Sequence, residues 1–172
     1  SDYAVSAASL RFATGTSVKN VNGPVTLPAG STLNAAALDI QLSGGLLPGA
    51  GGLGTVTNAS ASFPVTLQLG APAGTTNTLA AGAIGDREDG PLALVKEGAG
   101  LLALQGPIAF RGGLRVGAGP LQLDSPAALG DGDLSFGTGA VLSFQSGGTL
   151  DKLLYADNQA GANDRSTRLA LP

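Results

Sequence analysis

Short stretches of alternating apolar residues recur at a nearly constant spacing through the second half of this chain. They lie at 92–95, 102–104, 114–116, 121–123, 134–136 and 142–144. The middle residues of alternate stretches are 22 (93 to 115), 19 (103 to 122), 20 (115 to 135) and 21 (122 to 143) positions apart. A fixed period of this length is typical of repeat architectures. It predicts a β-solenoid with coils of about 20 residues, stacked about 4.8 Å apart.

Glycines between these stretches support the same architecture. The 28 glycines and ten prolines of the 172-residue chain are too many for a helical bundle, and they favour frequent turns. Eight of the glycines fall between the predicted strands, where left-handed backbone conformations are needed. They are Gly98, Gly100, Gly112, Gly113, Gly117, Gly119, Gly130 and Gly132.

The alternation also predicts which side chains face the core. Leu, Val and Phe occupy the inward positions, and Ala, Arg, Gln and Ser occupy the outward ones. An antiparallel β-sandwich is the alternative fold, because its strands also alternate and recur every 8–12 residues. The joint recurrence of the period and of Gly-x-Gly favours the solenoid.

We expect one elongated β-rich domain over residues 1–172. An irregular β region spans 1–60, with strands expected at 10–12, 25–27 and 38–42, and a regular repeat region spans 61–155. Residues 44–54 and 70–78 are rich in Gly, Pro or Thr, so we expect loops there. A polar tail over 156–172 ends in a short alternating stretch at 169–171 that could pair with an open sheet edge.

Composition excludes several functions. The chain has no Cys and no His, so it cannot hold a thiolate metal site or a Ser-His-Asp or Cys-His nucleophile. Its net charge of −3 and its lack of a basic run argue against nucleic acid as a partner. No apolar run of 18 residues exists, so we expect no membrane-spanning helix. No secretory leader is visible, as expected if a leader was removed or if the chain is an excised segment.

A family resemblance rests on three stretches. Residues 94–106 read Leu-Val-Lys-Glu-Gly-Ala-Gly-Leu-Leu-Ala-Leu-Gln-Gly, residues 110–123 read Phe-Arg-Gly-Gly-Leu-Arg-Val-Gly-Ala-Gly-Pro-Leu-Gln-Leu, and residues 127–130 read Ala-Ala-Leu-Gly. Together they resemble the passenger-associated repeat of bacterial autotransporters, over about residues 84 to 144. Leu114 stands where that repeat usually has Thr, and Pro120 replaces its usual Thr or Ser. The resemblance implies a right-handed parallel β-helix outside a bacterial cell, and it implies no catalytic residue.

Two acidic clusters are candidates for a cation or glycan site. Residues 86–89 read Asp-Arg-Glu-Asp, which a solvated turn with a local ion pair explains. Asp131 and Asp133 are weak candidates for a calcium-binding turn, because calcium needs six to eight oxygen ligands and no neighbouring coil repeats the pair. We therefore expect no metal and no cofactor.

Charged residues in the repeat region are candidates for a carbohydrate-cleaving site. Asp124, Arg115 and Arg111 could converge in neighbouring coils. A glycosidase needs two carboxyl groups at a defined separation, and the spacing shows no such pair. Scattered surface charges explain these residues better, and we expect no enzymatic activity.

Open solenoid ends offer the remaining prediction. Natural solenoids cap their ends, and the sequence contains no convincing amphipathic helix at either end. We therefore expect a non-catalytic structural or adhesive protein whose copies associate head to tail into a filament or surface array. Tyr3 and Val5 at one end, and Leu169 and Leu171 at the other, are the expected contact residues, by strand addition between copies. The alternatives are a glycan-binding or lyase- or tail-spike-like β-helix, and a passive stalk segment of a larger autotransporter.

Overall fold

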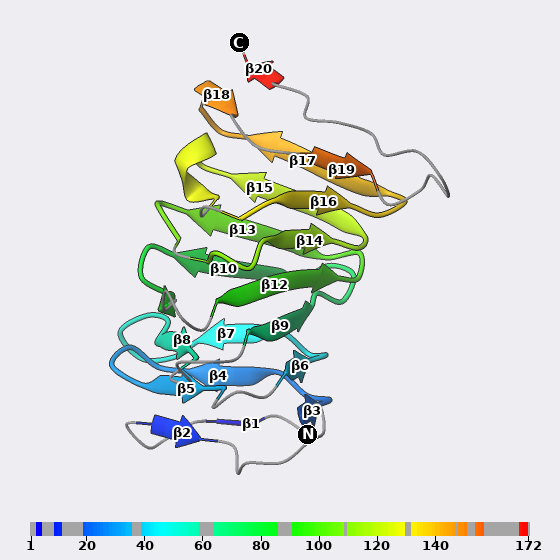
Figure 1. The fold of residues 1–172 in the computed structure, drawn as a ribbon. Helices are drawn as coiled ribbons and strands as arrows, with labels where there is room; N and C mark the ends of the chain where they lie inside the picture. The colour runs from blue at the N-terminus through cyan, green and yellow to red at the C-terminus, as the bar shows by residue number, and fades with distance from the viewer. Residues whose placement is uncertain are drawn as a thin grey trace.

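The protein is an all-β parallel solenoid of about five turns (Figure 1). The structure is a computed structural model. It describes residues 3–4, 9–11, 19–35, 39–58, 64–85, 91–108, 110–129, 132–146, 148–150, 154–156 and 169–171. Every strand pair in these ranges is parallel except one, between the last two strands of the third side. The predicted solenoid is confirmed, and the antiparallel sandwich is wrong.

Each coil has up to three sides. The first side is a continuous seven-stranded sheet. Its strands, in order along the solenoid, are β3 (Lys19–Val21), β6 (Ile40–Leu42), β9 (Val65–Gly70), β12 (Leu92–Glu97), β14 (Leu114–Val116), β16 (Leu134–Phe136) and β19 (Leu154–Ala156). This sheet runs through both the N-terminal third and the regular repeats, so the two belong to one solenoid.

The second side consists of two sheets that follow one another along the axis. Its strands are β1 (Tyr3–Ala4), β4 (Val25–Leu27) and β7 (Leu46–Pro48), then β10 (Thr76–Ala80), β13 (Leu101–Gln105), β15 (Gly119–Leu123) and β17 (Ala140–Phe144). The ladder of hydrogen bonds is interrupted between β7 and β10. Both strands still belong to the second side, because β7 directly follows β6 and β10 directly follows β9 of the first side.

The third side is regular only in the first coils. Its elements are β2 (Ser9–Arg11), β5 (Thr32–Asn34), β8 (Thr55–Thr57), β11 (Ile84–Gly85), the 3₁₀ turn η1 (Pro126–Ala128), β18 (Gly148–Leu150) and β20 (Leu169–Leu171). β2, β5, β8 and β11 form one sheet, β18 packs against η1, and β20 pairs antiparallel with β18. β1 and β20 lie at opposite ends of the stack (Figure 1).

The observed register confirms the period in the regular region. Ala103 pairs with Gln122, Arg115 with Ser135, and Gln122 with Ser143, at the predicted separations of 19, 20 and 21. The remaining separation, predicted as 22 between positions 93 and 115, is 20 in the structure. The reason is that β12 extends to Glu97, so that Val95 is the partner of Arg115.

Two consecutive coils of the first half are longer than predicted, and the average coil has about 23 residues. Leu92 pairs with Val65, a separation of 27, because longer turns are inserted between the strands. The loop expected at 44–54 contains β7, whose Leu46 is fully buried. The loop expected at 70–78 is shortened by β9 and β10, which leave a turn at 71–75. In both places glycine and proline content concealed a short strand.

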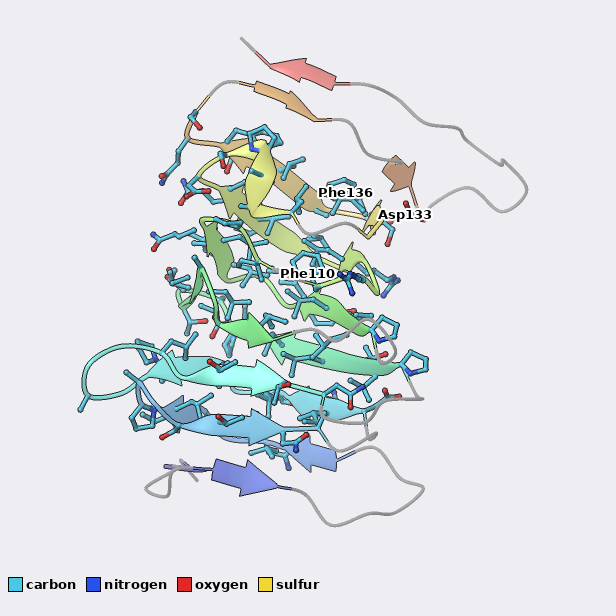
Figure 2. The ribbon with its side chains drawn as sticks, turned by 60° about the vertical axis from the view of Figure 1, so that its left-hand side comes forward. Phe110, Asp133 and Phe136 are labelled. Atoms are coloured by element: carbon cyan, nitrogen blue, oxygen red, sulfur yellow. The ribbon has the colours of Figure 1, made fainter. Side chains whose placement is uncertain are left out.

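Inward side chains form columns along the axis. In β12, Leu92 and Leu94 are fully buried, and Lys96 is buried in phase with them. Phe110 fills the interior beside the third side and is 1% exposed (Figure 2). Because a Leu or Val stacks on a Leu in coil after coil, burial of apolar surface is continuous along the solenoid.

Candidate functional site

The two ends of the solenoid carry strand edges without partners in the described part of the chain. At the C-terminal end these are β17 on the second side and β19 on the first side, each the last strand of its sheet. At the N-terminal end, β3, β1 and β2 are the first strands of the first, second and third sides. Unpaired edges of this kind are templates for pairing with another chain.

The apolar core is only partly covered at the C-terminal end. Leu142 and Phe144 of β17 pair in register with Leu121 and Leu123 of β15, which are fully buried. Leu142 and Phe144 are themselves only partly buried. Val141, on the outward position just before Leu142, is 58% exposed. The last described coil therefore leaves apolar surface that a further coil would cover.

The expected contact residues fall at these ends. Tyr3 lies in β1, and Leu169 and Leu171 lie in β20, which pairs with β18 of the same chain. Val5 lies outside the described residues. The structure thus pairs the tail with a sheet edge within the chain. A role of these residues in contacts between copies stays a prediction.

Lys96 occupies an unexpected position at the corner between the first and second sides. The side chain is fully buried, and its Nζ donates to the carbonyl oxygens of Gly98 and Ala118, both at 2.5 Å. Burial lowers the pKa of the Lys96 ammonium from its usual 10.5, and the adjacent Glu97 carboxylate opposes that shift. The ammonium therefore joins the turn at Gly98 to the next coil at Ala118 through their backbone carbonyl groups.

Asn77 plays a similar part where the second side is interrupted. The side chain is 2% exposed, its Oδ1 accepts from the Leu46 backbone N–H at 3.0 Å, and its Nδ2 donates to the Gly70 carbonyl at 3.1 Å. The amide thus replaces ladder hydrogen bonds between β7 and β10. Neither Asn77 nor Lys96 was singled out from the sequence. Lys96 could have been found from the sequence, because it occupies a position that the alternation of β12 directs inward, where the other residues are apolar.

A shallow hollow of about 240 Å³ lies on the outside of the first side. Gln41 and Gln68 pair in register at its floor, and Glu97 lines it from the next coil. A side chain at position 70 would fill part of it, but a Cβ there would meet the Ser43 carbonyl oxygen at 2.0 Å, so glycine is required. The hollow offers amides and a carboxylate, which can hydrogen-bond hydroxyl groups.

The three charged residues considered for carbohydrate cleavage occupy separate positions. Arg115 is on the first side and forms an ion pair with Glu97 at 3.3 Å. Asp124 follows β15 on the second side, where its Oδ2 accepts from the Gly106 N–H at 2.6 Å. Arg111 is exposed and precedes β14. The described residues therefore form no pair of facing carboxyl groups from this set.

The acidic cluster at 86–89 lies outside the described residues, and so does Asp131. Asp133 is exposed at the rim of its coil, just before β16 (Figure 2). Its backbone oxygen accepts from the Leu114 N–H at 2.8 Å, a ladder contact. In the part of the chain that the structure describes, no three acidic side chains gather to hold a metal ion.

Comparison with known proteins adds no identification. No protein family, no curated protein and no solved structure matches this chain. Among the described residues, no helix is long and apolar enough to cross a membrane. The class of protein that the fold defines is a parallel β-solenoid.

Proposed function

We propose that this chain is a non-catalytic structural or adhesive solenoid whose copies associate head to tail outside a bacterial cell. One observation carries the proposal: in the described part of the chain, the two ends offer strand edges without partners on corresponding sides of the coil. A contact between opposite ends is heterologous, and without closure it grows into a filament. The extracellular location rests on the resemblance of residues 84–144 to the autotransporter repeat.

The apolar surface at the C-terminal end supports this proposal. Covering Leu142 and Phe144 by another coil would remove apolar area from water, at about 25 cal/mol per Å². The low charge of the chain, 12% of its residues, also weakens electrostatic repulsion between copies.

The test is negative-stain electron microscopy with sedimentation over a range of protein concentrations. We expect filaments with a subunit repeat of roughly 34 Å, since seven strands stack about 4.8 Å apart on the first side. A protein that stays monomeric at every concentration overturns the proposal and leaves the stalk segment as the better interpretation.

The outer hollow favours one second candidate, binding of a glycan chain. Gln41, Gln68 and Glu97 would hydrogen-bond sugar hydroxyls there. Glycan-array binding that Gln68→Ala abolishes, with no change in the unfolding midpoint, would support it. Equal binding by the variant would exclude this hollow.

A further inference from the structure

We infer that the joint between copies continues the solenoid in register on two of its three sides, with β3 of one copy on β19 of the next, and β1 on β17. This inference rests on the proposed head-to-tail association and names its contact surface, a second copy of this chain. It follows from three observations: the order of sides at the two ends, the register of the columns, and the place of β20.

The order of sides matches across the two ends. The last strands of the regular coils are β17 on the second side, β18 on the third and β19 on the first. The first strands of the chain are β1 on the second side, β2 on the third and β3 on the first. A second copy that follows β19 therefore begins on the side where the next coil must begin. All strands of the first two sides are parallel, so direction is preserved as well.

An unbroken column fixes the register of the joint on the first side. The column consists of Lys19, Ile40, Leu67, Leu94, Leu114, Leu134 and Leu154, each paired with the next. Continuation by one more strand places Lys19 of the second copy on Leu154. The neighbouring outward column then places Asn20 on Tyr155.

The register of the joint on the second side is inferred in the same way, across the interruption between β7 and β10. Tyr3 pairs with Val25, and Val25 with Leu46, whose N–H bonds to Asn77. Beyond the interruption, a second column of paired residues begins at Asn77. It continues through Leu102 and Leu121 to Leu142. Tyr3 of the second copy therefore falls on Leu142, one of the partly covered core residues.

The third side is already closed within the chain. β20 pairs antiparallel with β18, and it occupies the place that β2 of a second copy would take in a continuous solenoid. β20 skips the second side and leaves β17 without a partner among the described residues. The joint is therefore limited to the first and second sides while β20 is in place.

The test is disulfide trapping, which this chain suits because it has no cysteine. In the double variant Asn20→Cys/Tyr155→Cys the two thiols lie at opposite edges of the seven-stranded sheet, about 29 Å apart, too far for a bond within one copy. Across the inferred joint their Cα atoms are about 4.8 Å apart, within the range of a disulfide. The matched control is Asn20→Cys/Ser135→Cys, whose second thiol is in the same column but one strand inside the edge.

After mild oxidation we expect the first variant to give a ladder of covalent oligomers on non-reducing gels, and the control to give at most dimers. Filaments that form without the ladder overturn this joint but leave head-to-tail association standing. A protein that forms no filaments and no ladder overturns both.

A second measurement keeps the joint testable if the cysteine variants fold poorly. Lys19 occupies an inward register position of the edge strand β3, and burial of an ammonium in a joint is unfavourable. Lys19→Leu should therefore lower the protein concentration at which filaments form by about tenfold or more. An unchanged or higher threshold overturns the placement of Lys19 in the joint.

Discussion

The Nζ of Lys96 donates to the carbonyl oxygen of Ala118, a residue 22 positions later and one coil further along the axis. This hydrogen bond crosses between coils at the corner where the first side turns into the second. Lys96 is fully buried although its side chain carries a charge. It makes the corner a point where the stability of the solenoid can be measured.

Lys96→Met should destabilise the fold. The substitution removes the hydrogen bonds from the ammonium to the carbonyls of Gly98 and Ala118, and a hydrogen bond to a charged group contributes about 1.5–3 kcal/mol. Removal of a buried ammonium offsets part of that cost. We expect a net loss of about 2 kcal/mol in the free energy of unfolding, measured by urea denaturation. Arg115→Ala, which removes an exposed ion pair, is the control and should cost less than about 1 kcal/mol. A Met variant as stable as the parent would contradict the prediction.

Stability should also depend on the protonation of Lys96. Burial lowers its pKa in the folded chain below the usual 10.5, so the folded chain loses this proton at a lower pH than the unfolded chain. Between the two values the unfolded state binds more protons, and stability contributed by this group rises with pH. The difference in urea midpoint between the parent and Lys96→Met should therefore grow in favour of the parent as the pH rises towards 10.5. Parallel curves for the two proteins would show that the proton affinity of Lys96 is the same in both states.

Gly119→Ala tests the space around the same ammonium. Gly119 has φ of +73°, and a Cβ there would meet the Gly98 carbonyl oxygen at 2.5 Å and the Lys96 Nζ at 2.6 Å. Gly139 has φ of +81° in the corresponding turn of the next coil, and a Cβ there meets nothing within 4 Å. Both alanine variants carry the left-handed backbone cost of about 1–2 kcal/mol. We expect Gly119→Ala to lose at least about 2 kcal/mol more than Gly139→Ala in urea unfolding. Equal losses would mean that the corner can widen freely.

Asn77→Ala should loosen the contact between β7 and β10. The Leu46 N–H loses its acceptor and the Gly70 carbonyl loses a donor, at a combined cost of about 2–4 kcal/mol. Hydrogen exchange should report faster exchange of the Leu46 amide. Gln68→Ala, on the outer surface, is the control and should change stability by less than about 0.5 kcal/mol. Unchanged exchange at Leu46 would show that the amide does not maintain this contact.

Truncation after Arg168 tests the role of β20. Removal of residues 169–172 frees the edge of β18, so β2 of a second copy can pair there and add a third ladder to the joint. We expect filaments with the same repeat at a lower protein concentration, seen by electron microscopy and sedimentation. A chain lacking only Pro172 is the control. Loss of filaments would instead mean that Leu169 and Leu171 join the copies directly, by strand addition.

The sequence by itself determined the solenoid and three of the four strand separations expected in its regular coils. Alternation places Leu114 and Leu134 inward, and the pairing of Arg115 with Ser135 follows from a spacing of 20 residues. Such periodic signals are local and repeated, so each coil gives independent evidence for the same strand spacing. The lengths of the coils from Ile40 to Leu67 and from Val65 to Leu92 were mispredicted because turns of variable size carry no periodic signal, and the short strand β7 was not predicted because it lies among glycines.

Only the tertiary structure decided how the polar groups of the corner are satisfied and what the ends expose. Lys96 and Ala118 are far apart in sequence, and their contact depends on the turn between β14 and β15 ending at one particular place. The partner of Asn77 likewise comes from a different coil, 31 residues away. The pairing of β20 with β18 depends on which edge is free after the last coil, a property of the stacked chain and of no single segment. Periodicity specifies how the coils repeat. At the ends and corners the alternating pattern is interrupted, so the hydrogen-bond partners there depend on which groups the folded chain brings close together.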